Sequence, residues 1–202
     1  MLKKLLLGLL LSGSVSYAMH EFELNLNNKD LDLHLGLDMG QFNHAIEPDS
    51  FMVKARLMKG DNAHSRLPYD QDPEILSEVG FVVQSTSALA PELMVGLGLK
   101  VAFTPLDNDE SVLAMPIGIV ADYTLPLDIP IPLHVGGQFY YAPEVLSFER
   151  STSYTEYQAN FDIQLMERAF ITTGYRGIKT PTKERSNAYY NRSYFVGVRF
   201  LF

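Results

Sequence analysis

The sequence predicts an all-β fold, an antiparallel transmembrane β-barrel of about ten strands that follows a cleavable signal peptide. Apolar and polar residues alternate along most of the chain, and the N-terminus reads as an export signal. After that signal, no stretch reaches the roughly 18 uninterrupted apolar residues of a spanning helix. Alternation marks strands with two unlike faces, and strands satisfy all their backbone groups in lipid only as a closed barrel.

The first residues have the three parts of a secretory signal peptide. Lys3 and Lys4 form a positive start, Leu5–Leu11 form a short apolar core, and Ser16-Tyr17-Ala18 is a small-x-small cleavage site. The core is much shorter than the ~20 residues of a membrane-spanning helix. We therefore expect residues 1–18 to be a signal peptide and residues 19–202 to form one barrel domain.

Charge and composition exclude several classes of function. The net charge is −8, and becomes −10 once Lys3 and Lys4 are removed with the signal peptide, which argues against a nucleic-acid partner. There is no cysteine, so thiol catalysis and cysteine-ligated metals are excluded. The five histidines have no metal-ligand spacing, and HExxH, GxSxG and phosphate-loop patterns are absent. We expect no catalytic residues, no cofactor and no metal.

The alternating segments are long enough to cross a membrane. Most exceed ten residues, whereas strands of soluble proteins average five or six and tilted membrane strands need ~9–11. The first pair is short and joined by Asn27-Asn28-Lys29-Asp30, so a barrel of eight strands is the alternative. The ten expected strands cover residues 21–27, 30–40, 50–59, 75–86, 91–104, 112–124, 131–142, 153–166, 168–178 and 189–202.

The links between these segments alternate in length. Residues 60–74, 105–111, 143–152 and 179–188 form longer polar links, whereas 87–90, 125–130 and the turn at Glu167 are tighter. Outer-membrane barrels have short periplasmic turns and longer extracellular loops, so the longer links are expected outside. The link 41–49 is the exception, because it is long on the expected periplasmic side.

Glycine and aromatic residues indicate which face meets lipid. Glycines concentrate on the polar rows, as expected for a crowded lumen. Aromatic residues near the strand ends match the two interfacial girdles of a membrane barrel, namely Phe51, Phe103, Tyr123, Tyr141, Tyr157, Tyr175, Tyr190 and Tyr194.

This orientation directs the polar rows into the lumen. Charges confined there should pair, and we expect Asp38, Asp122 and Asp162 to pair with Lys54, Arg56 and Arg199. The candidate lumen-lining residues are Asp32, His34, Asp38, Lys54, Arg56, Glu78, Lys100, Asp122, His134, Glu156, Asp162, Arg176 and Arg199.

The last strand has the pattern of an outer-membrane assembly signal. Its apolar row ends on a terminal phenylalanine and comprises Tyr194, Val196, Val198, Phe200 and Phe202. We expect the outer-membrane assembly machinery to recognise this segment.

Short motifs in the second half of the chain resemble those of a known family. They are Tyr141-Ala142-Pro143-Glu144, Tyr154-x-Glu156, Gly174-Tyr175-Arg176 and Gly197-Val198-Arg199-Phe200. With them the chain resembles the YfaZ family of outer-membrane proteins. The resemblance implies a porin-like barrel and carries no catalytic residues or substrate.

These inferences predict an integral protein of a Gram-negative outer membrane, in contact with outer-membrane lipid and lipopolysaccharide. The expected function is a narrow porin-like channel whose resting lumen is plugged by paired charges. One alternative is a structural or loop-displaying barrel without transport, and another is a soluble periplasmic β-barrel. The oligomeric state and any solute are left open.

Overall fold

The computed structural model describes residues 20–65, 74–106, 111–183 and 186–202, and the expected signal peptide lies outside them. Ten antiparallel strands close into a barrel in the order β1-β2-β3-β4-β5-β7-β8-β10-β11-β12, with β12 paired to β1. The ten-strand prediction is confirmed and the eight-strand alternative is wrong. The wall strands are β1 (Glu21–Leu26), β2 (Leu31–Asp38), β3 (Phe51–Lys59), β4 (Leu76–Ser87), β5 (Ala90–Pro105), β7 (Ile117–Thr124), β8 (Leu133–Ala142), β10 (Tyr154–Met166), β11 (Ala169–Lys179) and β12 (Tyr189–Leu201).

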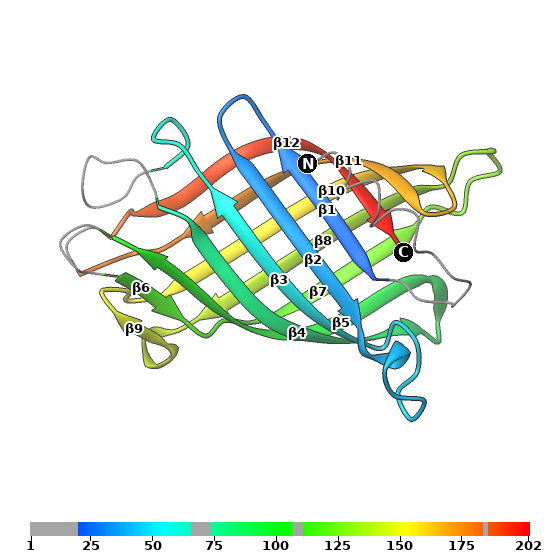
Figure 1. Ribbon diagram of the computed structural model, residues 1–202, viewed down its shortest axis with the longest axis horizontal. Helices are drawn as coiled ribbons and strands as arrows, with labels where there is room; N and C mark the ends of the chain where they lie inside the picture. Colours follow the sequence, from blue (N-terminus) through cyan, green and yellow to red (C-terminus); the bar gives the residue numbers. More distant parts are fainter. Residues whose placement is uncertain (1–19, 66–73, 107–110, 184–185) are drawn as a thin grey trace, which may run out of the picture.

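The barrel has two unlike ends, shown in Figure 1. At the terminal end, β1 begins and β12 finishes, and a short 3-10 helix, η1 (Met39–Gln41), lies in the link between β2 and β3. At the loop end lie the described parts of the expected longer links and two short strands, β6 (Ser111–Ala114) and β9 (Ser147–Glu149). A second 3-10 helix, η2 (Glu144–Leu146), leads into β9. No helix in the described residues is long and apolar enough to cross a membrane.

The segment 112–124, expected as one strand, is two strands separated by Met115 and Pro116. Proline has no N–H to give to the sheet, so the ladder is interrupted there, although the Pro116 carbonyl still accepts from the Lys100 N–H at 3.1 Å. Before the break, β6 continues along β5 and also pairs with β9, which the sequence prediction missed. β9 has only three residues, too few for alternation to be visible.

Apolar side chains cover the outside of the wall, as the sequence orientation predicts. On β5 and its two neighbours, Leu97 is 65% exposed, Val83 54% and Ile119 59%, and these three residues are cross-strand partners. Charged residues such as Glu78, at 4%, are buried instead. A soluble barrel would reverse this arrangement, so the observed one favours a barrel surrounded by lipid.

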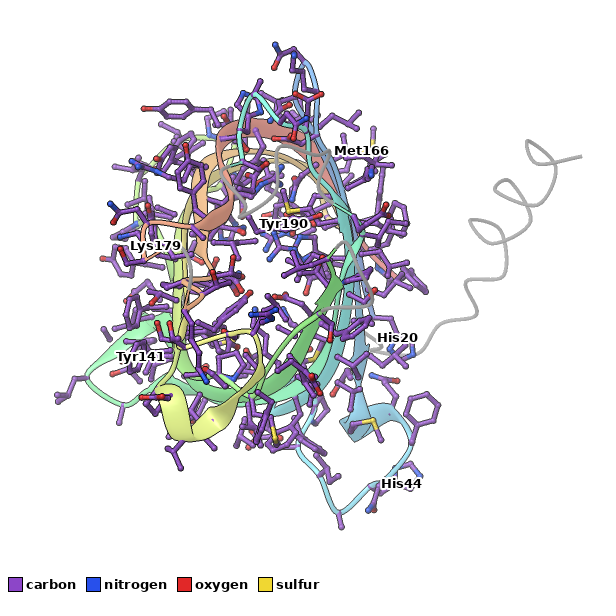
Figure 2. All side chains as sticks on the ribbon, turned by 90° about the vertical axis from the view of Figure 1, so that its left-hand side faces the viewer. His20, His44, Tyr141, Met166, Lys179 and Tyr190 are labelled. Atoms are coloured by element: carbon purple, nitrogen blue, oxygen red, sulfur yellow. The ribbon has the colours of Figure 1, made fainter. Side chains whose placement is uncertain are left out.

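One aromatic residue expected in the outer girdle faces the other way. Tyr190 is fully buried inside the ring of strands, whereas Tyr141 and Lys179 lie on the outer side (Figure 2). The register between β11 and β12 shifts between Ile178 and Lys179, opposite the start of β12. Such a shift sends the next side chain to the opposite face, so simple alternation assigned Tyr190 wrongly.

Candidate functional site

The inward side chains form three successive layers along the barrel. Nearest the loop end is an apolar cluster, next comes a network of charges, and toward the terminal end an open pocket follows. The layers arise because the inward rows of several strands change at similar depths, from Met58 to Arg56 on β3, from Leu76 to Glu78 on β4 and from Tyr154 to Glu156 on β10. The interior is the only described region in which many polar side chains converge, and it is therefore the candidate site.

The apolar cluster surrounds Tyr190 at the loop end. The Tyr190 hydroxyl oxygen accepts from the Leu76 N–H at 3.2 Å and lies 2.8 Å from the Met58 carbonyl oxygen, so it fastens β12 to β3 and β4 across the interior. The buried members of the cluster are Met58, Leu76, Ala102, Ala114, Ala142, Tyr154, Ile178 and Tyr190.

The charge network centres on Arg56 and three carboxylates. The Arg56 guanidinium donates to both oxygens of Asp32 at 2.8 and 2.9 Å, and to Glu156 at 2.9 Å. Its third carboxylate contact, with Glu78, is longer at 3.4 Å. Lys100 bridges the same two glutamates, lying 2.9 Å from Glu78 and in close contact with Glu156. Each of these three carboxylates therefore has a cationic partner inside the barrel.

Arg176 and Tyr154 complete the network. Arg176 is fully buried and donates to Asp32 at 2.6 Å and to Asn191 at 3.2 Å. The Tyr154 hydroxyl lies 2.5 Å from Glu78 and 2.8 Å from Glu156. Tyr154 thus belongs both to the apolar cluster and to the charge network, and joins the two layers.

The network connects opposite walls of the barrel. Arg56 lies on β3 and Glu156 on β10, which are five strands apart around the ring of ten. Their contact therefore crosses the centre of the interior. Ion pairs between neighbouring strands could leave an axial opening, but a pair between opposite strands occupies that axis.

The Tyr140 side chain packs on the inner face of the wall beside this network, because two glycines leave space for its ring. The Tyr140 ring lies against Gly98 and Gly118, where an added Cβ would collide with the hydroxyl and the ring respectively. The Lys100 ammonium sits over the same ring, 4.4 Å from its centroid. These glycines thus provide the close approach that lets an aromatic residue lie flat on neighbouring strands.

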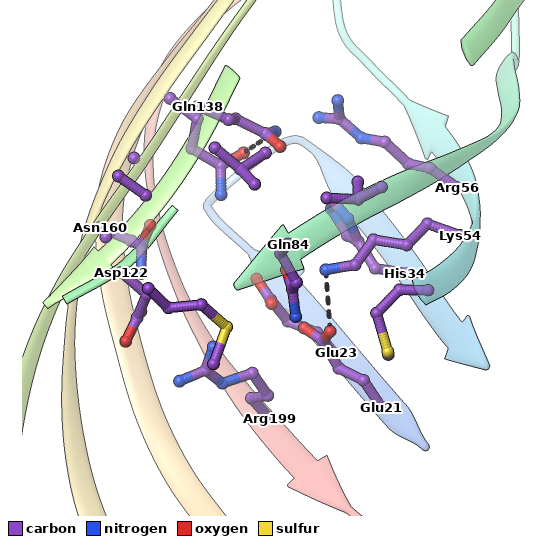
Figure 3. Close-up of a pocket in the computed structure, with 18 of the residues that line it drawn as sticks. Glu21, Glu23, His34, Lys54, Arg56, Gln84, Asp122, Gln138, Asn160 and Arg199 are labelled. Carbon is purple, nitrogen blue, oxygen red and sulfur yellow. Dashed lines mark hydrogen bonds and ion pairs between the residues drawn. The ribbon is translucent and has the colours of Figure 1, made fainter. Parts of the chain in front are cut away.

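Toward the terminal end the interior widens into a pocket of about 450 Å³. Figure 3 shows Glu21 and Glu23 on one side of it and Asp122 and Asn160 on the other. Lys54 pairs with Glu21 at 3.0 Å. The remaining polar lining is rich in amides, with Gln84, Gln138, Gln158, Asn160 and Gln164. Pockets of this size accommodate small molecules.

The structure places the thirteen candidate lumen residues in different surroundings. Seven of them line the pocket, namely His34, Lys54, Arg56, Glu78, Lys100, Asp122, His134, and an eighth, Arg199, lines it beside Phe170. Asp32, Glu156 and Arg176 lie deeper, in the charge network. Asp162 is fully buried against Arg199 at 2.7 Å.

Of the three acids expected to pair with Lys54, Arg56 or Arg199, only Asp162 does so, with Arg199. Arg56 belongs to the central network instead. Asp122 lies 3.5 Å from His134 rather than beside a lysine or arginine. Asp38 caps η1, accepting from the Gly40 N–H at 2.9 Å, because it stands where β2 ends and a 3-10 turn begins.

Sequence reasoning missed several interior residues that the same alternation could have identified. Glu21 is two residues before Glu23, which alternation also directs inward, and Tyr154 is two before Glu156, so each shares an inward row with an acid. Tyr140 follows Gln138 in the same way. Aromatic residues were interpreted only as members of the outer girdles, so Tyr140 and Tyr154 were missed.

Two polar residues in the link after β3 form ion pairs with residues that precede β2. His64 lies 3.0 Å from Asp30, and Asp61 pairs with Lys29 at 3.2 Å. Hydrogen bonds from Asn191 and Asn27 lower the pKa of the Asp30 carboxyl despite its burial. The acids of two further polar stretches, which could act as cation ligands or catalytic acids by residue type, lie outside the described residues; they are Asp70, Asp72, Asp107, Asp109 and Glu110.

Asp49 lines the pocket, where partial burial and a nearby acid disfavour the charged form of its carboxyl group. Burial, with Asp38 nearby, raises its pKa, so the folded state holds its proton more tightly than the unfolded state. The charged form therefore costs stability above that pKa, and the cost disappears as pH falls through it. We expect Asp49→Asn to raise the unfolding temperature at neutral pH and to lose that advantage in acid. Asparagine also tolerates the φ of 60° found there.

Thermal unfolding of the detergent-solubilised barrel at neutral and acidic pH measures this effect. Asp128→Asn, in the exposed link between β7 and β8, is the matched control and should change little. An equal gain for both variants at both pH values would contradict the assignment to Asp49.

The chain shows similarity to one protein family and to several solved structures. The family model described as "YfaZ precursor" matches residues 59–202. No curated protein matches the sequence significantly. Among solved structures, the chain is similar to in-vitro folded OmpT, an outer membrane protein of Vibrio cholerae, with 11% identity and a TM-score of 0.35, over 90% of this chain and 64% of that chain. Against outer-membrane expressed OmpT of the same organism the identity is 12% and the TM-score 0.36, over 86% of this chain and 56% of that one. The chain thus spans 56–64% of the length of these structures.

A closed wall with an apolar exterior and a charged interior is the architecture of outer-membrane proteins, because it satisfies every wall backbone group without water. This chain has that architecture and is an outer-membrane β-barrel. The family match covers more than two thirds of its residues, including the last seven strands of the wall. The chain therefore belongs to the YfaZ family.

Proposed function

We propose that this protein is a narrow, porin-like channel whose lumen is closed in the resting state. The observation that carries the proposal is the ion pair between Arg56 and Glu156, which joins opposite walls across the barrel axis. Barrels of about eight to ten strands have interiors that side chains nearly fill, whereas open porins have sixteen or more. The apolar cluster around Tyr190 adds a second barrier at the loop end.

A channel is favoured over an inert barrel because the interior is not filled along its whole length. The pocket of about 450 Å³ extends from the network toward the terminal end, and charged and amide side chains are among the residues that line it. Among the described residues, the network and the apolar cluster separate the pocket from the loop end. A movement of these two layers would connect the two sides of the membrane.

Single-channel recording in planar bilayers tests the proposal. The wild-type barrel should pass little steady current. The triple variant Arg56→Ala, Lys100→Ala, Tyr154→Ala removes the cross-barrel bases and the residue that joins the two layers, so it should conduct. Glu78 and Glu156 would remain as unpaired acids, and the resulting pore should prefer cations.

The control carries Lys179→Ala and Arg192→Ala, which remove the same number of positive charges from the exposed outer face. Heat-modifiable gel mobility verifies that each variant is folded. Large steady current in the wild type would contradict a closed lumen. Absence of current through the folded triple variant would contradict the channel proposal and favour a barrel whose function lies in its outer loops.

A further inference from the structure

The pocket toward the terminal end carries an excess of acidic groups. Its described lining has six carboxylates and four lysine or arginine side chains, with the histidines counted as neutral. The acids are Glu21, Glu23, Asp49, Glu78, Asp122 and Glu167, and the bases are Lys54, Arg56, Lys100 and Arg199. The charge of this pocket therefore favours a cationic occupant.

All four bases are already held by other carboxylates. Arg56 and Lys100 belong to the central network, and Lys54 pairs with Glu21. Arg199 pairs with Asp162 and lies over the Phe170 ring, 4.6 Å from its centroid. An anionic ligand would have to break one of these pairs, which disfavours phosphates and carboxylates as occupants.

Glu23 is a buried acid of this pocket that forms no close ion pair with a lysine or arginine among the described residues. It is 8% exposed and accepts a hydrogen bond from the Asn25 amide at 2.5 Å. In the described part of the chain, no lysine or arginine lies within ion-pair distance of it; Arg199 and His34 act on it only from further away. A buried carboxylate that lacks a cation is costly, and a bound cation would remove that cost.

Asp122 provides a second acid on the opposite wall. Glu23 lies on β1 and Asp122 on β7, which are five strands apart around the ring of ten, and the pocket lies between them (Figure 3). The Asp122 side chain is 36% exposed to the pocket, and its ion-pair contact is His134 at 3.5 Å. The amides of Gln84 and Asn160, which also line the pocket, add carbonyl acceptors.

These acceptors suit ammonium groups better than a metal ion. Among the described residues, no group of three or more histidine, aspartate or glutamate side chains is arranged to hold a metal. Separate carboxylates on two walls, accompanied by amide carbonyls, instead match groups that each donate several hydrogen bonds. An alkylammonium group has three such donors and needs no converging ligand shell.

We propose that this pocket binds a small linear diamine, with one ammonium group at Glu23 and the other at Asp122. The site goes beyond the proposed channel function. It needs only the pocket, so a barrel that conducts no current would still bind.

Isothermal titration of the refolded full-length barrel in detergent, with α,ω-diaminoalkanes of increasing chain length, tests this inference. The wild type should bind best at one chain length, because the two acids have a fixed separation. Glu23→Gln and Asp122→Asn should each weaken binding by roughly tenfold or more, since each removes one charge partner without changing the shape.

The matched controls are Glu47→Gln and Asp128→Asn, which remove exposed acids from the links outside the pocket and should leave the affinity unchanged. Diols of the same lengths should not compete. The proposal is overturned if the diamines do not bind to the wild type, if the diols bind equally well, or if the pocket and control variants lose affinity alike. Heat-modifiable mobility of each variant excludes loss of the fold as the cause.

Discussion

Removing the Arg56 side chain should destabilise the barrel by about 3–5 kcal/mol, the cost of leaving buried charges unpaired. Arg56 is 5% exposed and contacts Asp32, Glu78 and Glu156, so Arg56→Ala would strip a cation from three buried acids at once. Urea unfolding of the barrel in phospholipid vesicles measures this loss.

Lys54→Ala is the control on the same strand. Lys54 also forms an ion pair, but its side chain is 45% exposed, and exposed pairs contribute at most about 1 kcal/mol. Adding Glu156→Gln to Arg56→Ala should restore part of the stability, because it removes one of the stranded charges. Equal losses in the free energy of unfolding for Arg56→Ala and Lys54→Ala would show that the buried network stabilises the barrel no more than an exposed ion pair does.

A charge placed on the outer face should be nearly as damaging. Leu97 lies in the middle of β5 and is 65% exposed on the apolar surface. An arginine at the midplane of a bilayer costs roughly 2–4 kcal/mol, so Leu97→Arg should impair both folding into vesicles and the stability of the folded barrel.

The matched control places the same side chain on the other face. Gln84→Arg, on the neighbouring strand β4, points into the polar pocket, where acids such as Glu23 are present. Gly98 is unsuitable for this purpose, since any Cβ there would collide with Tyr140. Equal tolerance of Leu97→Arg and Gln84→Arg in vesicles would show that the faces are assigned the wrong way round.

The sequence was sufficient to predict which face each side chain would take, because alternation is a local property of a strand. Alternation with their neighbours directs Leu97 and Lys100 to opposite faces, and the structure places them so. The same reasoning failed at Tyr190, where a register shift reverses the pattern. It also failed at Pro116, where the ladder is interrupted.

The partners of the interior charges could not be predicted in this way. Arg56 meets Glu156 because β3 and β10 stand opposite each other once ten strands have closed with a particular stagger. That stagger is a property of the whole ring, and no short stretch of sequence encodes it. It was therefore possible to predict that charges pair inside the barrel. It was not possible to predict that Arg56 pairs with Asp32 rather than with Asp38 or Asp122.

The connection between opposite walls also has a consequence for how the barrel is made. Arg56 and Glu156 are 100 residues apart in the chain, and Asp32 and Arg176 are 144 apart. Contacts between residues so far apart in the sequence form late, after the intervening strands have been arranged. If hairpins entered the bilayer one after another, Arg56 and Asp32 would be carried into lipid before β10 and β11 arrived to complete the network. The route of lowest cost is therefore for the strands to assemble while still shielded from lipid, with closure of β1 on β12 and release into the membrane as a single final event.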